Sequence, residues 1–397
     1  MQGGSIPRRT LFTFAGGSGH LEPLIPLARA AEAERHTVAF AGRPWMIPQV
    51  DAAGFPAFVA GSDAGLAPTR LPLGKADPDQ DMRDVGSGFG RRIARERAAD
   101  ILSLCMEWQP DLLVCEELDF GAMVVAERFG LPYATVLVSA TGAFVRPGLV
   151  AGPLDEVRAE HGLPGDPSLA MLSRYLVLTP FPPSLRDPGS PLPTTAHHMR
   201  LLTFDAARSE AAPPWLTHQE DVPTVYFSLG TVYNMESGDL FQRVLSGLRD
   251  LPINLIVTVG RDLDPDELGT QPTNVHVKRF IPQAALLPHC DLVVSHAGSG
   301  SVLGALAHGL PMMLMPIGAD QPLNAARCQA LGVAEVLDAV GATPEMVRAA
   351  VSSVLADAGF RGTAERIRDE IAALPGPEYA VTLLDRLASE RAPLLST

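Results

Sequence analysis

The chain has 397 residues, 46% of them hydrophobic and 19% charged, and this length predicts two domains because single hydrophobic cores stop growing near roughly 250 residues. Its 31 basic and 45 acidic residues give a formal net charge of −14, which argues against nucleic acid as a partner. No apolar stretch approaches the ~18 residues of a membrane span, and no signal peptide precedes the first expected strand. We therefore expect a soluble, cytoplasmic protein with neither a nucleic-acid nor a membrane partner.

From Thr10 onward, short apolar runs alternate with glycine-containing turns and segments of helical periodicity, which predicts a parallel sheet flanked by helices. In the first half, the expected strands are Leu11–Ala15, Thr37–Ala41, Leu112–Cys115 and Ala134–Val138. The expected helices include Leu21–Glu34, which starts beside Pro23, and Gly121–Phe129.

The alternation breaks between Thr179 and Pro223, where prolines cluster, so we expect a linker in this stretch. A second α/β series follows, with expected strands at Thr224–Ser228, Asn254–Val259, Val275–Lys278, Leu292–Ser295 and Met312–Met315. Its expected helices lie near Asp239–Leu248, Ser301–His308 and Asn324–Ala330.

The expected fold is therefore α/β, with two tandem Rossmann-like doubly wound parallel-sheet domains that face each other across a cleft. We expect an N-terminal domain at 8–200, a linker at 201–222, a C-terminal domain at 223–376 and a final helical segment at 377–397. Neither half carries a GxGxxG fingerprint with the following acidic residue, which disfavours nicotinamide chemistry.

The chain has four cysteines, and they show neither CxxC spacing nor histidine partners at zinc-site distances. We expect them to be small buried hydrophobic residues rather than metal ligands or redox groups. They are Cys105, Cys115, Cys290 and Cys328.

The residues that end parallel strands are the ones to search for chemistry, because ligands bind at the carboxyl ends of such strands. His296 ends an expected strand, and residues 297–301 form a small-residue turn before a helix. Small residues let backbone N–H groups approach an anion, and a helix N-terminus adds about half a positive charge. The segment is compatible with a diphosphate site, although glycines and serines also make ordinary tight turns.

Asp320 and Gln321 follow the next strand and favour a ligand site over an ordinary turn. An acid and an amide can together accept from and donate to several hydroxyls of one ring, as sugar recognition requires. A phosphate site beside a polyol site indicates a sugar nucleotide.

Several segments then carry a resemblance to a known family, at 16–30, 110–134 and 277–332 and in the run YFSLGT that ends at Thr231. In order and spacing they resemble the nucleotide-sugar-dependent glycosyltransferases of antibiotic and other natural-product pathways, which are members of the GT-B superfamily. The resemblance covers nearly the whole chain. It implies that 8–200 binds the acceptor, that 223–376 binds the donor, and that a helix at Glu378–Glu390 crosses back to the first domain.

The same resemblance implies the residues of the donor site. The residues implied to bind the diphosphate are Ser228, Gly230, Thr231, His296, Gly298, Ser299, Gly300 and Ser301. The nucleobase would pack at Phe280 and Ile281, and the donor sugar would contact Asp320 and Gln321. Related enzymes that use UDP-sugars often hold the ribose with a glutamate where this chain has Gly304, so we expect a dTDP-sugar rather than a UDP-sugar.

Sugar transfer to a hydroxyl needs a base, because a neutral alcohol or phenol is a poor nucleophile near pH 7. His20 lies in the run AGGSGH after the first expected strand, where glycines leave room for an acceptor, although it could equally cap the helix. Glu116 is the partner that the resemblance implies, and Glu117 and Asp119 are alternatives nearby. Strand ends of one parallel sheet share an edge, so these groups can meet.

The resemblance implies direct displacement at the anomeric carbon with inversion, and we expect no cofactor and no metal ion. The acceptor is expected to be a hydrophobic aglycone in the N-terminal domain, near Phe89, Phe120, Phe144 and Val145. The other expected partner is the nucleotide-sugar donor, and a homodimer is an open alternative to a monomer. Two rival functions stay open, a nucleotide-sugar epimerase on the same fold and a non-catalytic sugar-nucleotide-binding helper protein.

Overall fold

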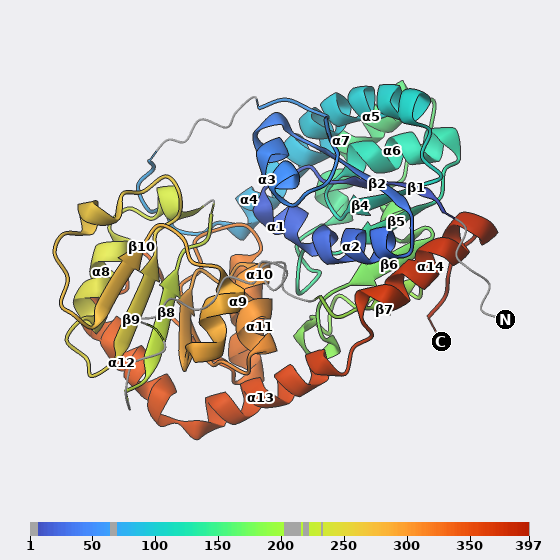
Figure 1. Ribbon diagram of the computed structural model, residues 1–397. Coiled ribbons are helices and arrows are strands. Elements are labelled where there is room, and N and C mark those ends of the chain that lie inside the picture. Colours follow the sequence, from blue (N-terminus) through green and yellow to red (C-terminus); the bar gives the residue numbers. More distant parts are fainter. Residues whose placement is uncertain (1–6, 64–69, 202–215, 217–221, 232, 397) are drawn as a thin grey trace.

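The computed structural model describes residues 7–63, 70–201, 216, 222–231 and 233–396, and the structural statements below refer to these residues. They form two α/β domains, which run from blue to green and from yellow to orange in Figure 1. The linker expected at 201–222 lies largely outside the described residues.

Within the described residues, the N-terminal sheet has seven strands in the order β3-β2-β1-β4-β5-β6-β7, all paired in parallel. The strands are β1 (Arg9–Thr13), β2 (Thr37–Gly42), β3 (Ala57–Val59), β4 (Leu112–Glu116), β5 (Tyr133–Val136), β6 (Leu176–Thr179) and β7 (Ala196–His198). Every residue of the central strand β4 is buried, as expected for a strand whose two faces are both covered by helices. The helices are α1 (Ser18–Leu21), α2 (Ile25–Ala33), α3 (Ile47–Ala52), α4 (Pro78–Ser87), α5 (Ala94–Trp108), α6 (Phe120–Phe129) and α7 (Pro147–Glu160).

The described part of the C-terminal sheet has six parallel strands in the order β10-β9-β8-β11-β12-β13. The strands are β8 (Thr224–Ser228), β9 (Asn254–Thr258), β10 (Val275–Lys278), β11 (Leu292–Ser295), β12 (Met312–Leu314) and β13 (Ala334–Val336). The helices are α8 (Leu240–Leu248), α9 (Gln283–Leu286), α10 (Ser299–Ala307), α11 (Gln321–Leu331), α12 (Pro344–Ala356) and α13 (Ala358–Ala372). In α8, Leu240, Val244 and Leu248 repeat at helical spacing and are buried, which turns one face of the helix to the core.

The chain ends by returning to the first domain. Helix α14 (Pro377–Glu390) lies along the N-terminal domain, at the end of the red segment in Figure 1. Its apolar side chains Val381 and Leu384 belong to the same buried cluster as Leu24 and Leu27 of the N-terminal domain. The last helix therefore ties the two domains together by hydrophobic packing.

The expected fold class is confirmed, because both halves are parallel sheets flanked by helices. Four short strands, β3, β6, β7 and β13, were not expected from the sequence. Two of them correct the expectation that the proline-rich stretch from Thr179 to Pro223 is only a linker. Strand β6 ends at Thr179, the first residue of this stretch, and β7 lies inside it as the edge strand of the first sheet. The four cysteines are buried, as expected.

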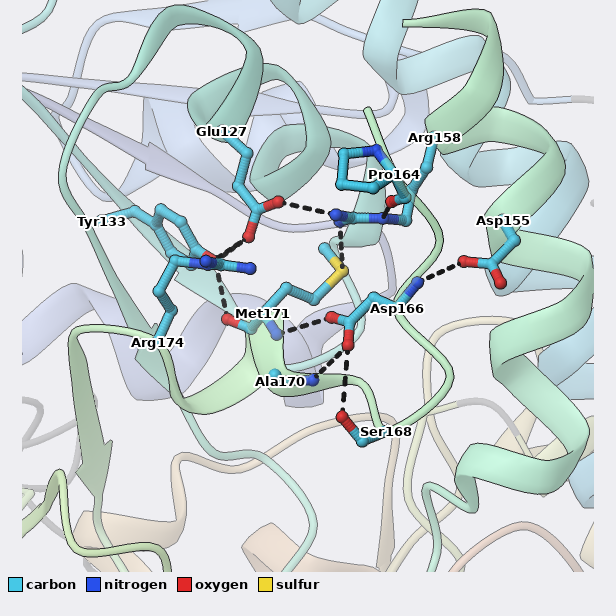
Figure 2. Close-up of polar contacts among 10 residues, drawn as sticks. All are labelled: Glu127, Tyr133, Asp155, Arg158, Pro164, Asp166, Ser168, Ala170, Met171 and Arg174. Carbon is cyan, nitrogen blue, oxygen red and sulfur yellow. Dashed lines mark hydrogen bonds and ion pairs between the residues drawn. The ribbon is translucent and has the colours of Figure 1, made fainter. Parts of the chain in front are cut away.

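A polar network lies at the opposite edge of the N-terminal sheet from the strand ends searched above (Figure 2). It is centred on Glu127 near the end of α6, which pairs with Arg158 of α7 and with Arg174. The Tyr133 hydroxyl, at the start of β5, lies within hydrogen-bond distance of two acceptors, the backbone oxygen of Met171 at 2.7 Å and Glu127 Oε1 at 3.1 Å, and shares its one proton between them. The network joins α6, α7 and the segment that leads into β6.

Candidate active site

The order of strands reverses once in each sheet, between β1 and β4 and between β8 and β11. At such a point the loops that leave neighbouring strands diverge to opposite faces, and the crevice between them is where open parallel sheets bind ligands. His20 follows β1 and Glu116 ends β4, while residues 228–231 and 296–301 follow β8 and β11. Both groups of predicted residues therefore lie at the reversal points.

The structure brings His20 and Glu116 together. The distance from His20 Nδ1 to Glu116 Oε2 is 3.1 Å, and the Glu116 side chain is completely buried. The backbone N–H groups of Ala15 and Leu118 also donate to this carboxylate. Burial alone would raise the pKa of Glu116, but His20 and the two backbone donors hold this pKa below its usual value. The carboxylate is therefore ionised at neutral pH.

The imidazole of His20 is held on more than one side. Gly16 lies against it, and a Cβ there would come within 2.2 Å of the ring, so only glycine fits. Phe89 stacks on the same ring with a centroid distance of 5.9 Å and an angle of 7° between planes. Burial is the largest influence and lowers the pKa of His20, but Glu116, with smaller contributions from Asp320 and Glu117, brings the net pKa above its usual value. Among the described residues, His20 Nε2 has no hydrogen-bond partner.

The position of His20 corrects one expectation. The sequence placed it at a strand end before a helix that starts at Leu21, whereas it lies inside the one-turn helix α1. The backbone N–H groups of His20 and Leu21 donate to the Gly17 carbonyl, so the helical turn closes before Pro23. The turn points the imidazole back toward β4.

The alternatives Glu117 and Asp119 have other partners. Glu117 accepts from the backbone N–H groups of Val138 and Ser139. Asp119 forms a completely buried ion pair with Arg97, at 2.5 Å, and caps α6. Glu116 is thus the carboxylate of the three that pairs with His20.

In the C-terminal domain, His296 sits between the two turns of the reversal point. A Cβ at either Gly230 or Gly298 would come within 2.7 Å of its ring, so both glycines are needed for the close approach. Burial lowers the pKa of His296 to about 4, so its imidazole is neutral at pH 7. Its Nδ1 is buried and lacks a hydrogen-bond partner in the part of the chain that is described.

The turn before α10 presents small groups to the site, as expected. Gly300 is exposed and Ser301 partly exposed at the start of the helix, while Thr231 is exposed after β8. The Ser228 hydroxyl accepts from the Gly230 N–H and so shapes its turn. Gly300 and Ser301 thus lie at a helix N-terminus, where backbone N–H groups are not used by the helix itself.

Ser299 differs from its neighbours in this turn because its hydroxyl is hydrogen-bonded to residues outside the turn. It donates to Asp320 Oδ2 at 2.6 Å and accepts from the backbone N–H of Ala140, in the N-terminal domain, at 2.9 Å. Asn324 Nδ2 also donates to it. The Ser299 hydroxyl is therefore occupied by contacts within the protein.

The predicted sugar-binding residues lie at the start of α11, which begins three residues earlier than expected. Gln321 accepts from the backbone N–H groups of Ile317 and Gly318 through Oε1. Burial raises the pKa of Asp320, whose carboxylate accepts from Ser299 and Asn324. Sequence reasoning missed Asn324, although its spacing of four residues from Asp320 on a helix was the available signal.

A cleft opens between the domains beside the turn that precedes α10. It is lined from one side by Gly19 and Pro23 and from the other by Gly300 and Gly304 of α10. A Cβ at Gly304 would sit 3.1 Å from the side-chain oxygen of Gln283, which also lines the cleft.

The two predicted nucleobase contacts differ in exposure. Phe280 is 54% exposed beyond the end of β10, whereas Ile281 is buried in the core. An exposed aromatic face of this kind can stack on a planar ring.

The four predicted acceptor residues do not lie together in the structure. Phe89 lies at His20, as the stacking shows, but Phe120 is completely buried in the N-terminal core. Phe144 is buried in the same cluster and Val145 packs against it. The expectation that Phe120 faces an acceptor is therefore corrected, because α6 turns this residue toward the core.

Two further observations concern the described residues. Among them, no three His, Cys, Asp or Glu side chains are grouped so as to hold a metal ion. None of their helices combines the length and the apolar character that a membrane span needs.

The chain is similar to known proteins over nearly its whole length. Residues 242–387 match the family described as erythromycin biosynthesis protein CIII-like, C-terminal domain. Tylactone mycaminosyltransferase of Streptomyces fradiae is 28% identical over 97% of this chain and 94% of its own length. The 3-alpha-mycarosylerythronolide B desosaminyl transferase of Saccharopolyspora erythraea is 27% identical over 96% of this chain and 99% of its own length.

Among solved structures, the glycosyltransferase VinC in complex with dTDP superimposes with a TM-score of 0.77 at 26% identity, covering 96% of this chain and all of VinC. The chain therefore has the GT-B fold, and its homologues are antibiotic-pathway glycosyltransferases. The resemblance inferred from the sequence is confirmed. These relatives support a glycosyltransferase identity for the chain.

Proposed function

We propose that the chain transfers a sugar, such as a deoxysugar, from a dTDP-sugar to a hydrophobic natural-product aglycone with inversion at the anomeric carbon. The observation that carries this proposal is the His20–Glu116 pair at one reversal point, with the turns of the other reversal point across the cleft. Asp320, from the C-terminal domain, is close enough to His20 to help raise its pKa. The base and the sugar loop thus face one reaction space.

His20 acts in this proposal as the general base. Nδ1 is paired with the ionised Glu116, so the proton of the neutral ring resides on Nδ1 and Nε2 carries the lone pair. Nε2 takes the hydroxyl proton of the acceptor while the acceptor oxygen bonds to the anomeric carbon. The bond from that carbon to the diphosphate oxygen breaks, and its electron pair leaves with the diphosphate. Glu116 stabilises the imidazolium that forms.

The leaving diphosphate is stabilised by fixed donors. The N-terminus of α10 contributes about half a positive charge, and the N–H groups of Gly300 and Ser301 lie at this end. His296 is neutral, so it supplies a hydrogen bond rather than a charge. Ser228, Gly230 and Thr231 would contact the diphosphate from the turn after β8. Because these groups are preorganised, we propose that transfer needs no metal ion.

The nucleoside would lie along α10, with its base on Phe280 and beside Ile281. Gly304 keeps this wall of the cleft free of a side chain next to Gln283. A deoxyribose lacks the 2′-hydroxyl that a carboxylate here would hold, which favours dTDP over UDP. The dTDP bound to the related VinC supports the same choice.

The function is tested by transfer from dTDP-sugars to a panel of polyketide and aromatic aglycones, with dTDP release and the mass of the product both followed. We expect equal amounts of dTDP and glycosylated product, with or without chelator. A sugar isomerised without transfer would instead identify an epimerase, and binding without any turnover would identify a helper protein.

Donor choice has its own measurement, the thermal shift given by dTDP and by UDP. A ligand at 100 times its Kd adds about 2.7 kcal/mol of apparent stability, and we expect the larger shift with dTDP. In Gly304→Glu, the preference should move toward UDP. A larger UDP shift in the unaltered chain would overturn the dTDP assignment.

A further inference from the structure

The loop between β12 and α11, which precedes Asp320, is held by side chains through three consecutive backbone N–H groups. Gln321 accepts from Ile317 and Gly318, as described above. The third N–H, that of Ala319, donates to Asp81 Oδ2 at 2.9 Å, and Asp81 belongs to the N-terminal domain. A residue of one domain therefore completes the hydrogen bonding of the sugar loop of the other.

Ala319 needs such support because its backbone is in the left-handed region, with φ of 54°. Residues with a side chain rarely adopt this conformation, and it persists where surrounding contacts maintain it. Ala319 directly precedes Asp320, so a change in its backbone would redirect the Asp320 side chain.

Asp81 is itself firmly placed. It lies on α4, whose Met82 and Val85 are buried in the N-terminal core. The helix continues without a break into residues 88–93, and these include Phe89, which stacks on His20. One continuous helical segment thus contacts the proposed base at one point and the sugar loop at another.

A second hydrogen bond between the domains ends at the same place. The Ala140 N–H of the N-terminal domain donates to Ser299 Oγ, and this hydroxyl donates to Asp320 Oδ2. Two contacts from the N-terminal domain therefore reach Asp320. One acts through the backbone of the preceding residue, Ala319, and the other acts through Ser299 on the carboxylate of Asp320.

We propose that Asp81 is a positioning residue, which holds the loop that carries Asp320 in its sugar-binding conformation once the two domains have met. The inference rests on the proposed function of the site. Asp81 touches neither the sugar nor the acceptor, and it acts through the backbone of Ala319. The sugar is then oriented for attack in the same closed arrangement in which Phe89 and Glu116 hold His20.

The experiment compares Asp81→Ala, Asp81→Asn and the control Asp84→Ala, which removes an exposed acid from the same helix. Asp81→Ala loses the acceptor for the Ala319 N–H, and we expect kcat to fall about tenfold with a smaller change in the KM of the acceptor. The amide oxygen of Asp81→Asn can still accept this hydrogen bond, so this variant should recover most of kcat. Asp84→Ala should match the unaltered chain.

Hydrogen exchange of the ligand-free protein provides a readout that does not depend on turnover. We expect the amides of residues 317–320 to exchange faster in Asp81→Ala than in Asp81→Asn or Asp84→Ala, while β8 and β11 keep their protection. Unchanged exchange in this loop would overturn the inference, as would a kcat of Asp81→Ala equal to that of Asp84→Ala.

The two proposals can fail separately. If the unaltered chain transfers no sugar, the proposed function is wrong, while exchange in residues 317–320 still decides whether Asp81 holds the loop. If transfer occurs and Asp81→Asn is as slow as Asp81→Ala, the acceptor role of Asp81 is wrong although the proposed function stands.

Discussion

Two glutamates of the N-terminal domain, Glu116 and Glu127, have carboxylates that are almost fully buried and paired with basic side chains. They lie at opposite edges of one sheet, and their surroundings differ in one respect. Glu116, at the carboxyl end of β4, accepts from His20 and two backbone N–H groups. Glu127, near the amino end of β5, forms an ion pair with Arg158, accepts from Arg174 and lies within hydrogen-bond distance of the Tyr133 hydroxyl (Figure 2). Each carboxylate therefore has three polar partners.

The two glutamates differ in whether the basic side chain paired with them can gain or lose a proton. An arginine guanidinium is a permanent cation with no lone pair to offer, so an arginine partner cannot act as a base. His20 can change its charge, and its Nε2 has no partner among the described residues. Burial and hydrogen bonding alone therefore do not distinguish a catalytic carboxylate from a structural one. The feature on which the proposed role of Glu116 rests is its titratable partner, His20, whose Nε2 is free to take a proton.

Removal of the proposed base should have the largest effect. We expect His20→Ala to lower kcat by about 10²- to 10⁴-fold, because the acceptor hydroxyl loses its base. Donor binding should be retained, since the diphosphate turn lies in the other domain. Transfer rates and the dTDP thermal shift together measure this. Near-normal turnover in the variant would show that His20 is not the base.

Loss of the structural glutamate should instead affect stability. In Glu127→Gln, the buried Arg158 keeps its charge but loses its counter-ion, and we expect the free energy of unfolding to fall by about 3 kcal/mol. The folded fraction should keep its kcat, because this network is distant from His20. Urea unfolding measures the stability of the variant, and an activity assay at low temperature measures its kcat. A variant with a lowered kcat but an unchanged free energy of unfolding would contradict a structural role for Glu127.

Neutralisation of the other glutamate should produce a smaller change, with a distinctive pH dependence. In Glu116→Gln, the imidazolium loses its stabilising charge, and we expect kcat to fall about 10- to 100-fold. Glu116 raises the pKa of His20, and the base is the neutral ring, so activity is lost as pH falls through this pKa. Without the negative charge the pKa drops, and the acidic limb of the kcat/KM profile should move to lower pH. If the acidic limb of the kcat/KM profile stays at the same pH in Glu116→Gln, a group other than His20 causes that limb.

Much of this architecture could be predicted from the sequence. The long apolar strands next to the reversal points, such as β4 and β8, are buried on both faces and therefore appear as continuous hydrophobic runs. The strand ends identified His20, Glu116 and His296, because a parallel sheet gathers such ends at one edge. Short edge strands such as β3 and β13 were missed, since three residues carry too little periodicity to be recognised.

The sequence by itself determined the two α/β domains, the positions of their central strands along the chain and the set of residues at the strand ends. Only the tertiary structure decided which partners these residues have. Glu116 rather than Glu117 meets His20, Ser299 bonds to Asp320 and Ala140, and Asp81 reaches Ala319 across the cleft. The contacts of Ser299 with Ala140 and of Asp81 with Ala319 depend on how the two domains are docked, and the other two depend on how strand ends are arranged within one sheet. Hydrophobic periodicity is a local property of each element and encodes neither arrangement.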